Sequence, residues 1–140
     1  AGRAAGAPAA GFVSPLVAML IGAVVAIVCV GAVELKSRLG YDDSLDAFGV
    51  HGVGGVCGML ATGLFALKAI NPAGADGLLA GNAGLLVTQV VAVAVVILYS
   101  CTMTFVLLKV IGAMIPLALN DDEQHDGMDL VLHNEVGYRL

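Results

Sequence analysis

The sequence has few charged residues and few aromatic ones. Only 12% of its 140 residues are charged, 5% are aromatic, and tryptophan is absent. A soluble domain is about 25% charged, whereas this chain is 59% hydrophobic and has a mean hydropathy of +0.98. A soluble core of this composition would leave too little polar surface to face water. The composition therefore predicts a membrane protein.

The sequence also lacks the patterns that several kinds of site require. It has no cluster of Lys and Arg of the kind that binds nucleic acid. Cys29, Cys57 and Cys101 each lie within an apolar run, so we predict three buried small side chains and neither a disulfide nor a metal-thiolate site. The residues from which a catalytic site would be built form no recognisable constellation; they are Ser44, Ser100, His125 and His133. We therefore expect no enzyme activity, no metal and no cofactor.

The first residues lack the features of a signal peptide. The stretch AGRAAGAPAAGF contains one Arg but no distinct apolar core followed by a cleavage site, and it does not begin with Met. We expect the printed sequence to begin within a longer polypeptide.

Three apolar runs are long enough to cross a bilayer, whose hydrocarbon core takes about 20 helical residues. We predict spans at about 12–33, 44–67 and 77–116, within a transmembrane part covering 1–119, and a polar tail at 120–140. Gly40 is expected to end the first helix, and Asn71-Pro72-Ala73-Gly74 to form a turn. The predicted fold class is an all-α, polytopic transmembrane helix bundle.

The third run is longer than a bilayer requires. Its uncharged part, Gly77 to Leu108, would extend about 48 Å as a helix with a rise of about 1.5 Å per residue. Such a helix is either tilted or projects from the membrane at its ends. The part around Gly81, Asn82 and Gly84 is an alternative interfacial segment.

The flanking positive charges favour one orientation of these spans. Cytoplasmic flanks are usually richer in Lys and Arg. One predicted side carries four of them and the other carries two; these are Lys36, Arg38, Lys109 and Arg139 against Arg3 and Lys68. The tail is therefore expected in the cytoplasm.

His51 is the residue that most directly indicates a function. In the apolar stretch Ala47 to Leu67 it is the only ionisable side chain besides the Cys57 thiol. An ionisable group in a span is costly and usually faces a bundle interior or a conduction path. Neutral imidazole donates one hydrogen bond and accepts one, so it could steer a small polar solute or take a proton from a desolvated cation. The alternative role is a single interhelical hydrogen bond.

Glycines surround this histidine. Regular helical spacing would place four small residues on its face, leaving open space beside the imidazole; they are Gly54, Gly55, Gly58 and Thr62. Glycine costs about 1 kcal/mol relative to alanine in a helix, so this number of them requires a reason. Close helix packing without a functional role is the alternative to solute access.

Acidic residues precede the second span. Asp42, Asp43 and Asp46 lie where negative charge complements a helix dipole and where carboxylates cap free N–H groups. A vestibule that attracts cations is the alternative role.

Three segments resemble the ammonium transporter (Amt/Mep/Rh) family. DDSLDAFGVHGVGGVCGMLATGLFA (Asp42 to Ala66) closely resembles its signature helix, and Gly54 in place of a second histidine is similar to the Amt/Mep branch. PAAGFVSP (Pro8 to Pro15) resembles the approach to the family's ninth helix. DGMDLVLHNEVGY (Asp126 to Tyr138) resembles its cytoplasmic tail, with His133-Asn134-Glu135 where His-Gly-Glu is usual.

The resemblance implies an architecture and a set of site residues. Family members have eleven transmembrane helices and form trimers, so the three spans would be helices nine to eleven, the C-terminal third. His51 would be the second member of the twin-histidine pair in the pore, and Ala47 would line the lumen below it. With Gly55 on the histidine's face, these are the predicted pore-lining residues, while Asp43 and Asp46 would stabilise the inner end of helix ten.

The resemblance also implies a function and partners. The substrate would be ammonium, deprotonated at the pore so that ammonia passes the histidines in a plasma or inner membrane. A homotrimer is implied, as is a PII-type signalling protein at the cytoplasmic tail.

Two parts of the family's site have no counterpart here. The first histidine of the pair belongs to helix five, and the outer aromatic cage would need residues that a chain without Trp does not offer. We therefore expect the 140 residues alone not to conduct ammonium. The alternative is a truncated, non-transporting membrane protein that associates with full-length subunits or signals through its tail.

Overall fold

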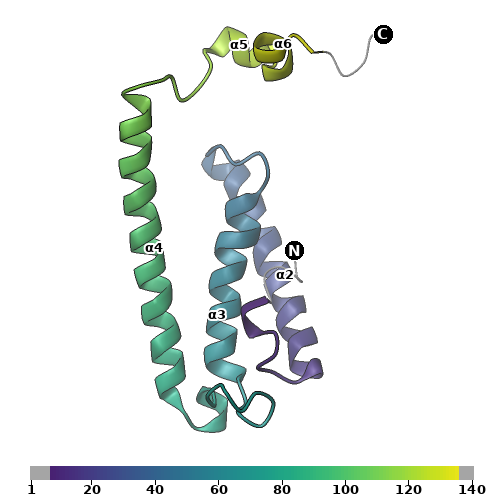
Figure 1. Cartoon of the computed structure of the whole chain (residues 1–140). Helices are drawn as coiled ribbons and strands as arrows, with labels where there is room; N and C mark the ends of the chain where they lie inside the picture. The colour runs from purple at the N-terminus through teal and green to yellow at the C-terminus, as the bar shows by residue number, and fades with distance from the viewer. Residues whose placement is uncertain (1–6, 136–140) are drawn as a thin grey trace. The chain divides into compact units, whose positions relative to one another are not determined.

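The computed structural model describes residues 7–135, and every regular element within that range is a helix (Figure 1). The α-helices and the short 3-10 and π-helical turns (η) are, in chain order, η1 (Ala7–Ala9), α2 (Pro15–Leu39), η2 (Phe48–Gly52), α3 (Val53–Phe65), η3 (Leu78–Ala80), α4 (Ala83–Gly112), α5 (Asp121–Asp126) and α6 (Met128–His133). The predicted all-α class is confirmed. The chain forms two units, residues 1–97 and 98–140, and the boundary falls within α4.

Three of the helical segments suit a membrane. Pro15–Leu39, Phe48–Phe65 and Ala83–Gly112 are long and apolar enough to cross a bilayer. Together they make a multi-pass membrane protein.

Both ends of α2 are set by local sequence. The Ser14 hydroxyl accepts a hydrogen bond from the amide of Val17 (3.5 Å), and Pro15 occupies the first turn, where its missing N–H costs nothing. At the other end Gly40 adopts a left-handed conformation (φ 68°) and donates its N–H to the Lys36 carbonyl (2.9 Å). The predicted stop at Gly40 is confirmed.

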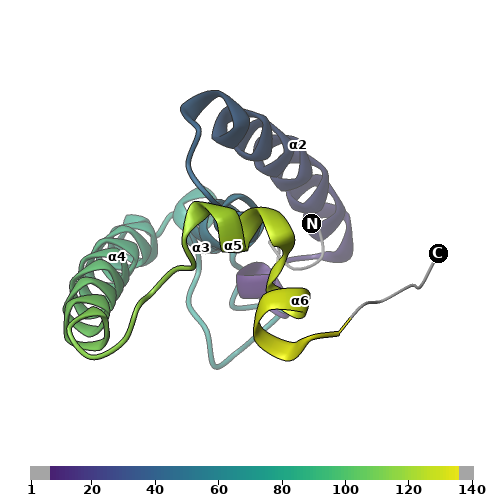
Figure 2. The same cartoon turned by 90° about the horizontal axis from the view of Figure 1, so that it is seen from above.

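In the first unit, α2 and α3 run antiparallel beside each other (Figure 1), and the view from above shows their axes inclined (Figure 2). Their buried core is small; it consists of Ala9, Val13, Ile21, Val25, Cys29 and Ala61. The second span approaches α2 closely at Gly49, near its first turn. A Cβ added there would lie 2.9 Å from Val33 Cγ2 and 3.4 Å from the Val33 amide nitrogen.

A second close contact joins α3 to the start of α4. A Cβ added at Gly63 would lie 2.9 Å from both Cα and Cδ1 of Leu86. The intervening loop contains the predicted turn, in which Gly74 donates its N–H to the Asn71 carbonyl (2.9 Å). The Asn71 side chain adds a bond from the amide of Ala73 (3.1 Å).

Helix α4 is shorter than the third apolar run of the sequence, from which it is predicted. Residues Leu78–Ala80 form a 3-10 turn, Gly81 follows with φ 93°, and Asn82 accepts a hydrogen bond from the Gly84 amide (3.0 Å). This turn and cap delay the start of α4 to Ala83. The helix then has 30 residues, or about 45 Å at about 1.5 Å per residue.

The expectation of three buried cysteines is wrong for one of them. Cys29 is buried and Cys57 is half-buried, but Cys101 is exposed, and all three are free thiols. Cys101 lies on α4, a helix that contains no buried residue. An apolar side chain in a membrane span therefore need not be buried by protein.

The second unit ends in two short helices. The side chain of Asn120 accepts from the Glu123 amide (2.9 Å) and the Glu123 carboxylate accepts from the Asn120 amide (3.0 Å), which is a capping box at the start of α5. Gly127 (φ 93°) separates α5 from α6. Arg3, Tyr138 and Arg139 lie outside the described residues, so the orientation based on flanking charges stays a prediction.

Substitution by alanine should change the stability of the fold differently at Gly63 and at Gly31. We expect Gly63→Ala to lower the free energy of unfolding by about 1–3 kcal/mol, because the added carbon meets the Leu86 backbone, which cannot rotate away. Gly31 in α2 has nothing within 4 Å of an added Cβ. Gly31→Ala should therefore be neutral or stabilise by up to about 1 kcal/mol. Thermal unfolding in detergent, followed by circular dichroism, compares them, and equal shifts would contradict this packing.

Candidate functional site

The second span begins at a cluster of acidic residues. Asp46 adopts φ 53°, a left-handed conformation, so helical structure starts at Ala47 rather than at Ser44. The Asp43 carboxylate accepts hydrogen bonds from the amides of Ala47 and Phe48, both at 2.9 Å. One carboxylate thus caps two of the N–H groups that a helix start leaves unpaired.

Lys36 joins this helix start to the end of α2. Its ammonium donates to the Asp43 carbonyl (2.8 Å) and forms an ion pair with the Asp46 carboxylate. The side chains of Lys36 and Asp46 are 18% and 38% exposed. Asp42 is exposed, and its carboxylate accepts no hydrogen bond from the described part of the chain.

The first turn of the span is a π-helix, which sequence reasoning missed. Over Phe48–Gly52 the helix is widened by one residue, and the amide of Val53 donates to the carbonyl of Phe48, five residues earlier. Gly52 makes room for the Phe48 ring, since an added Cβ would lie 2.9 Å from Phe48 Cδ2. That ring packs edge-on against Tyr41, with centroids 6.3 Å apart.

His51 lies on this π-turn and is exposed. Gly49, two residues earlier, faces α2, and two residues correspond to roughly half a turn of helix. The imidazole is therefore directed away from α2. Within residues 7–135 it makes no hydrogen bond, so its donor and its acceptor are both free to bind a solute.

The other predicted pore-lining residues flank the histidine with little bulk. Ala47 is exposed, and Gly55 has open space where a Cβ would stand. By contrast Gly54, Gly58 and Thr62, which regular spacing would place on the same face, are buried. The Thr62 hydroxyl donates to the Gly58 carbonyl (2.9 Å) and is thereby satisfied.

The expected continuous face is thus divided along its length. Helix α3 is contacted by η1 and η3 as well as by α2, whereas η2 contacts α2 and the helix α3 that continues it. The structure therefore brings Ala47, His51 and Gly55 together as an open surface and places the deeper small residues in packing contacts. Among the described residues no group of three potential metal ligands occurs.

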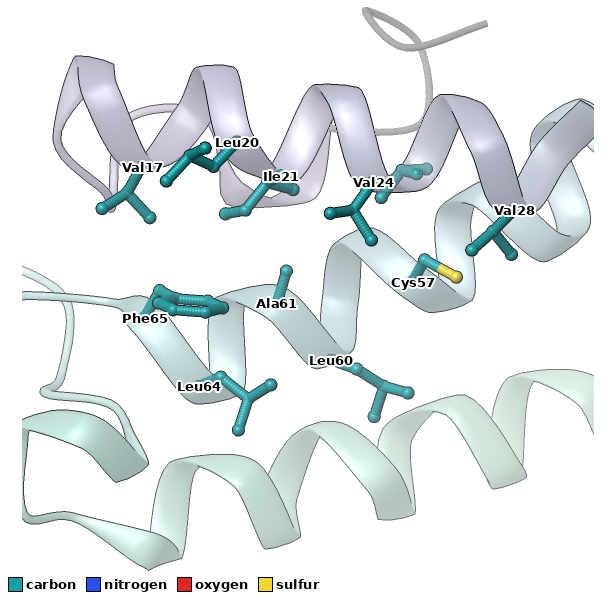
Figure 3. Close-up of a pocket in the computed structure, with 11 residues that line it drawn as sticks. Val17, Leu20, Ile21, Val24, Val28, Cys57, Leu60, Ala61, Leu64 and Phe65 are labelled. Carbon is teal, nitrogen blue, oxygen red and sulfur yellow. The ribbon is translucent and has the colours of Figure 1, made fainter.

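An apolar groove of about 340 Å³ runs between α2 and α3 (Figure 3). Ala61 and Phe65 point toward α2, while Leu60 and Leu64 point away from it. Its lining is aliphatic apart from Phe65 and the Cys57 thiol, so the groove offers no hydrogen-bonding group comparable to the imidazole. The candidate polar site of the span is therefore the His51 surface.

Comparison with known proteins shows the family to which the chain belongs. Residues 1–138 match the family model described as the Ammonium Transporter Family. The chain belongs to the Ammonium Transporter Family. An ammonium transporter of Bacillus subtilis (strain 168) is 46% identical over 140 residues, which cover 99% of this chain and 35% of that protein. Ammonium transporter Amt1 of Archaeoglobus fulgidus is 43% identical, with the same coverage of the two chains.

A solved structure extends the agreement from sequence to fold. The crystal structure of Saccharomyces cerevisiae Mep2 superposes with a TM-score of 0.72 at 32% identity, over 81% of this chain and 27% of that chain. The chain described here spans about a third of the length of the curated relatives that it matches.

The Asp43 cap predicts different effects for two adjacent acids. Asp43→Ala should lower the free energy of unfolding by about 0.5–2 kcal/mol, because two amides lose their acceptor. It should also speed hydrogen exchange at the amides of Ala47 and Phe48. Asp42→Ala is the matched control and should leave both measurements unchanged. Equal exchange in the two variants would show that Asp43 does not cap the helix.

Proposed function

We propose that this chain is the C-terminal part of an ammonium transporter subunit and that His51 lines the path of the substrate. The observation that carries the proposal is the His51 surface: an exposed imidazole on a π-turn of a membrane span, beside the open space at Gly55. It occurs in a member of the Ammonium Transporter Family.

The chemistry of this surface suits ammonia and ammonium. A neutral imidazole offers one donor and one acceptor. Ammonia can accept from the first and donate to the second, whereas a desolvated cation in an apolar span would be strongly disfavoured. Ala47 and Gly55 add no polar group and little volume, so the path beside the imidazole admits a small solute.

The rest of the path is supplied by other helices. His51 faces away from α2 and is exposed. We infer that the preceding helices of an eleven-helix subunit, including the one with the first histidine of the pair, complete the pore. No observation on residues 7–135 favours the alternative of a non-transporting membrane protein.

Assembly and regulation follow from the same proposal. We infer a homotrimer in a plasma or inner membrane, with the tail on the cytoplasmic side. In the tail, α6 carries exposed apolar side chains, including Met128 at 60% and Leu132 at 53% exposure. Such side chains offer a contact surface to neighbouring subunits or to a PII-type signalling protein.

A chimera tests the role of His51. The chain replaces the matching 35% of the Bacillus subtilis transporter, and ammonium and methylammonium uptake are measured in cells lacking their own transporters. We expect His51→Ala to change the uptake rate or the preference between the two substrates, because the free imidazole is lost, with trimer yield preserved. His125→Ala, in the exposed tail, is the matched control. Unchanged kinetics in His51→Ala would remove the residue from the mechanism.

The open space at Gly55 gives a second prediction. Gly55→Leu in the same chimera should fill the volume beside the imidazole and reduce uptake or disrupt assembly. Gly31→Leu changes a glycine of α2 that is equally open and lies on another helix, and it should retain uptake. Normal expression and normal flux in Gly55→Leu would contradict the proposed path.

A further inference from the structure

We propose that Lys36 is the positioning residue for His51, because it clamps the start of the second span and so holds the π-turn that directs the imidazole. This inference rests on the proposed role of His51 in transport. It assigns a specific task to a charged side chain that would otherwise count only as a flanking positive charge.

The clamp consists of two bonds from a single ammonium. Lys36 lies in the last turn of α2 and reaches the Asp43 carbonyl (2.8 Å) and the Asp46 carboxylate. Asp43 in turn caps the amides of Ala47 and Phe48. Lys36 thus connects the end of one span to the first turn of the next, immediately before the histidine.

The backbone of Asp46 supports this role of the connection. Its φ of 53° is a conformation that glycine adopts without steric cost and that Asp adopts at a cost that a bond to its side chain can offset. Here the carboxylate that occupies this position binds Lys36. The Asp46 carbonyl also accepts the amide of Val50 (2.9 Å), so the clamp fixes the first carbonyl of the helix.

The π-turn itself packs against α2. Gly49 lies against Val33, and the Cys29 thiol is 3.9 Å from the Val50 carbonyl. The first half of Phe48–Gly52 is therefore held by these contacts and by the clamp that precedes it. If the clamp were released, the turn could relax to a regular α-helix, and a shift of one residue would rotate His51 by about 100°.

The first test uses Lys36→Met in the chimera, because methionine keeps an unbranched apolar stem and removes the charge. We expect uptake to fall by at least about tenfold, since small misplacements of a site group have effects of this size or more. The fall should appear in the maximal rate and in the methylammonium-to-ammonium ratio, with trimer yield unchanged. Lys36→Arg should restore both. Arg38→Met removes an exposed positive charge from the same turn and should leave both at their original values.

Asp46→Gly provides a second variant, in which the positive φ at this position carries no steric cost. Glycine accepts the positive φ, so the fold should persist while the ion pair is lost. We expect the same altered ratio as in Lys36→Met, and no further change when the two substitutions are combined. If His51→Ala alters transport, a rate and ratio equal to those of the unsubstituted chimera in either single variant would overturn the positioning role. A failure of Lys36→Arg to restore them would overturn it as well.

A structural measurement separates this proposal from the proposed function. Cryo-electron microscopy of the Lys36→Met chimera should show the Phe48–Gly52 turn relaxed and the imidazole rotated. If His51→Ala transports normally while the turn relaxes in Lys36→Met, the proposed function fails and the positioning role is supported. If His51→Ala alters transport while the turn is unchanged in Lys36→Met, the positioning role is overturned and the proposed function stands.

Discussion

The contact between α2 and the second span is the constraint on which the rest of the first unit depends. It is made possible by Gly49, where even a methyl group would meet the backbone and side chain of Val33. Lipid offers no hydrophobic drive for helices to associate, so close backbone approach between small residues supplies the attraction. Because Gly49 faces α2, the imidazole two residues later must face away from it. A packing requirement on one side of the helix therefore produces the polar surface on the other.

The polar groups at the start of the second span meet a second requirement. A helix start leaves amide groups unpaired, and near a bilayer these cannot all rely on water. Asp43 pairs two of them, while Lys36 is bound to both Asp43 and Asp46. Charged residues that composition alone would describe as a cytoplasmic flank thus form one connected cluster. Its position one turn before His51 links the geometry of the membrane boundary to that of the proposed path.

The apolar surface of the chain is mostly unburied, and in a membrane this is no defect. No residue of α4 is buried, and α2 buries only Ile21, Val25 and Cys29. The remaining aliphatic side chains can face lipid or further helices at similar cost. The same reasoning explains why Cys101 is exposed although it lies in the middle of a span.

By itself, the sequence determined the class of fold and the outline of the site. Long uncharged runs predict membrane helices because a bilayer penalises charge, while Gly40 and Asn71 predict a helix end and a turn through local backbone preferences. The single histidine in its apolar span is visible for the same reason. Only the tertiary structure decided the left-handed Asp46, the π-turn and the Lys36 clamp. These features depend on how tightly Gly49 packs against α2. That contact joins residues far apart in sequence, and regular helical spacing cannot predict it.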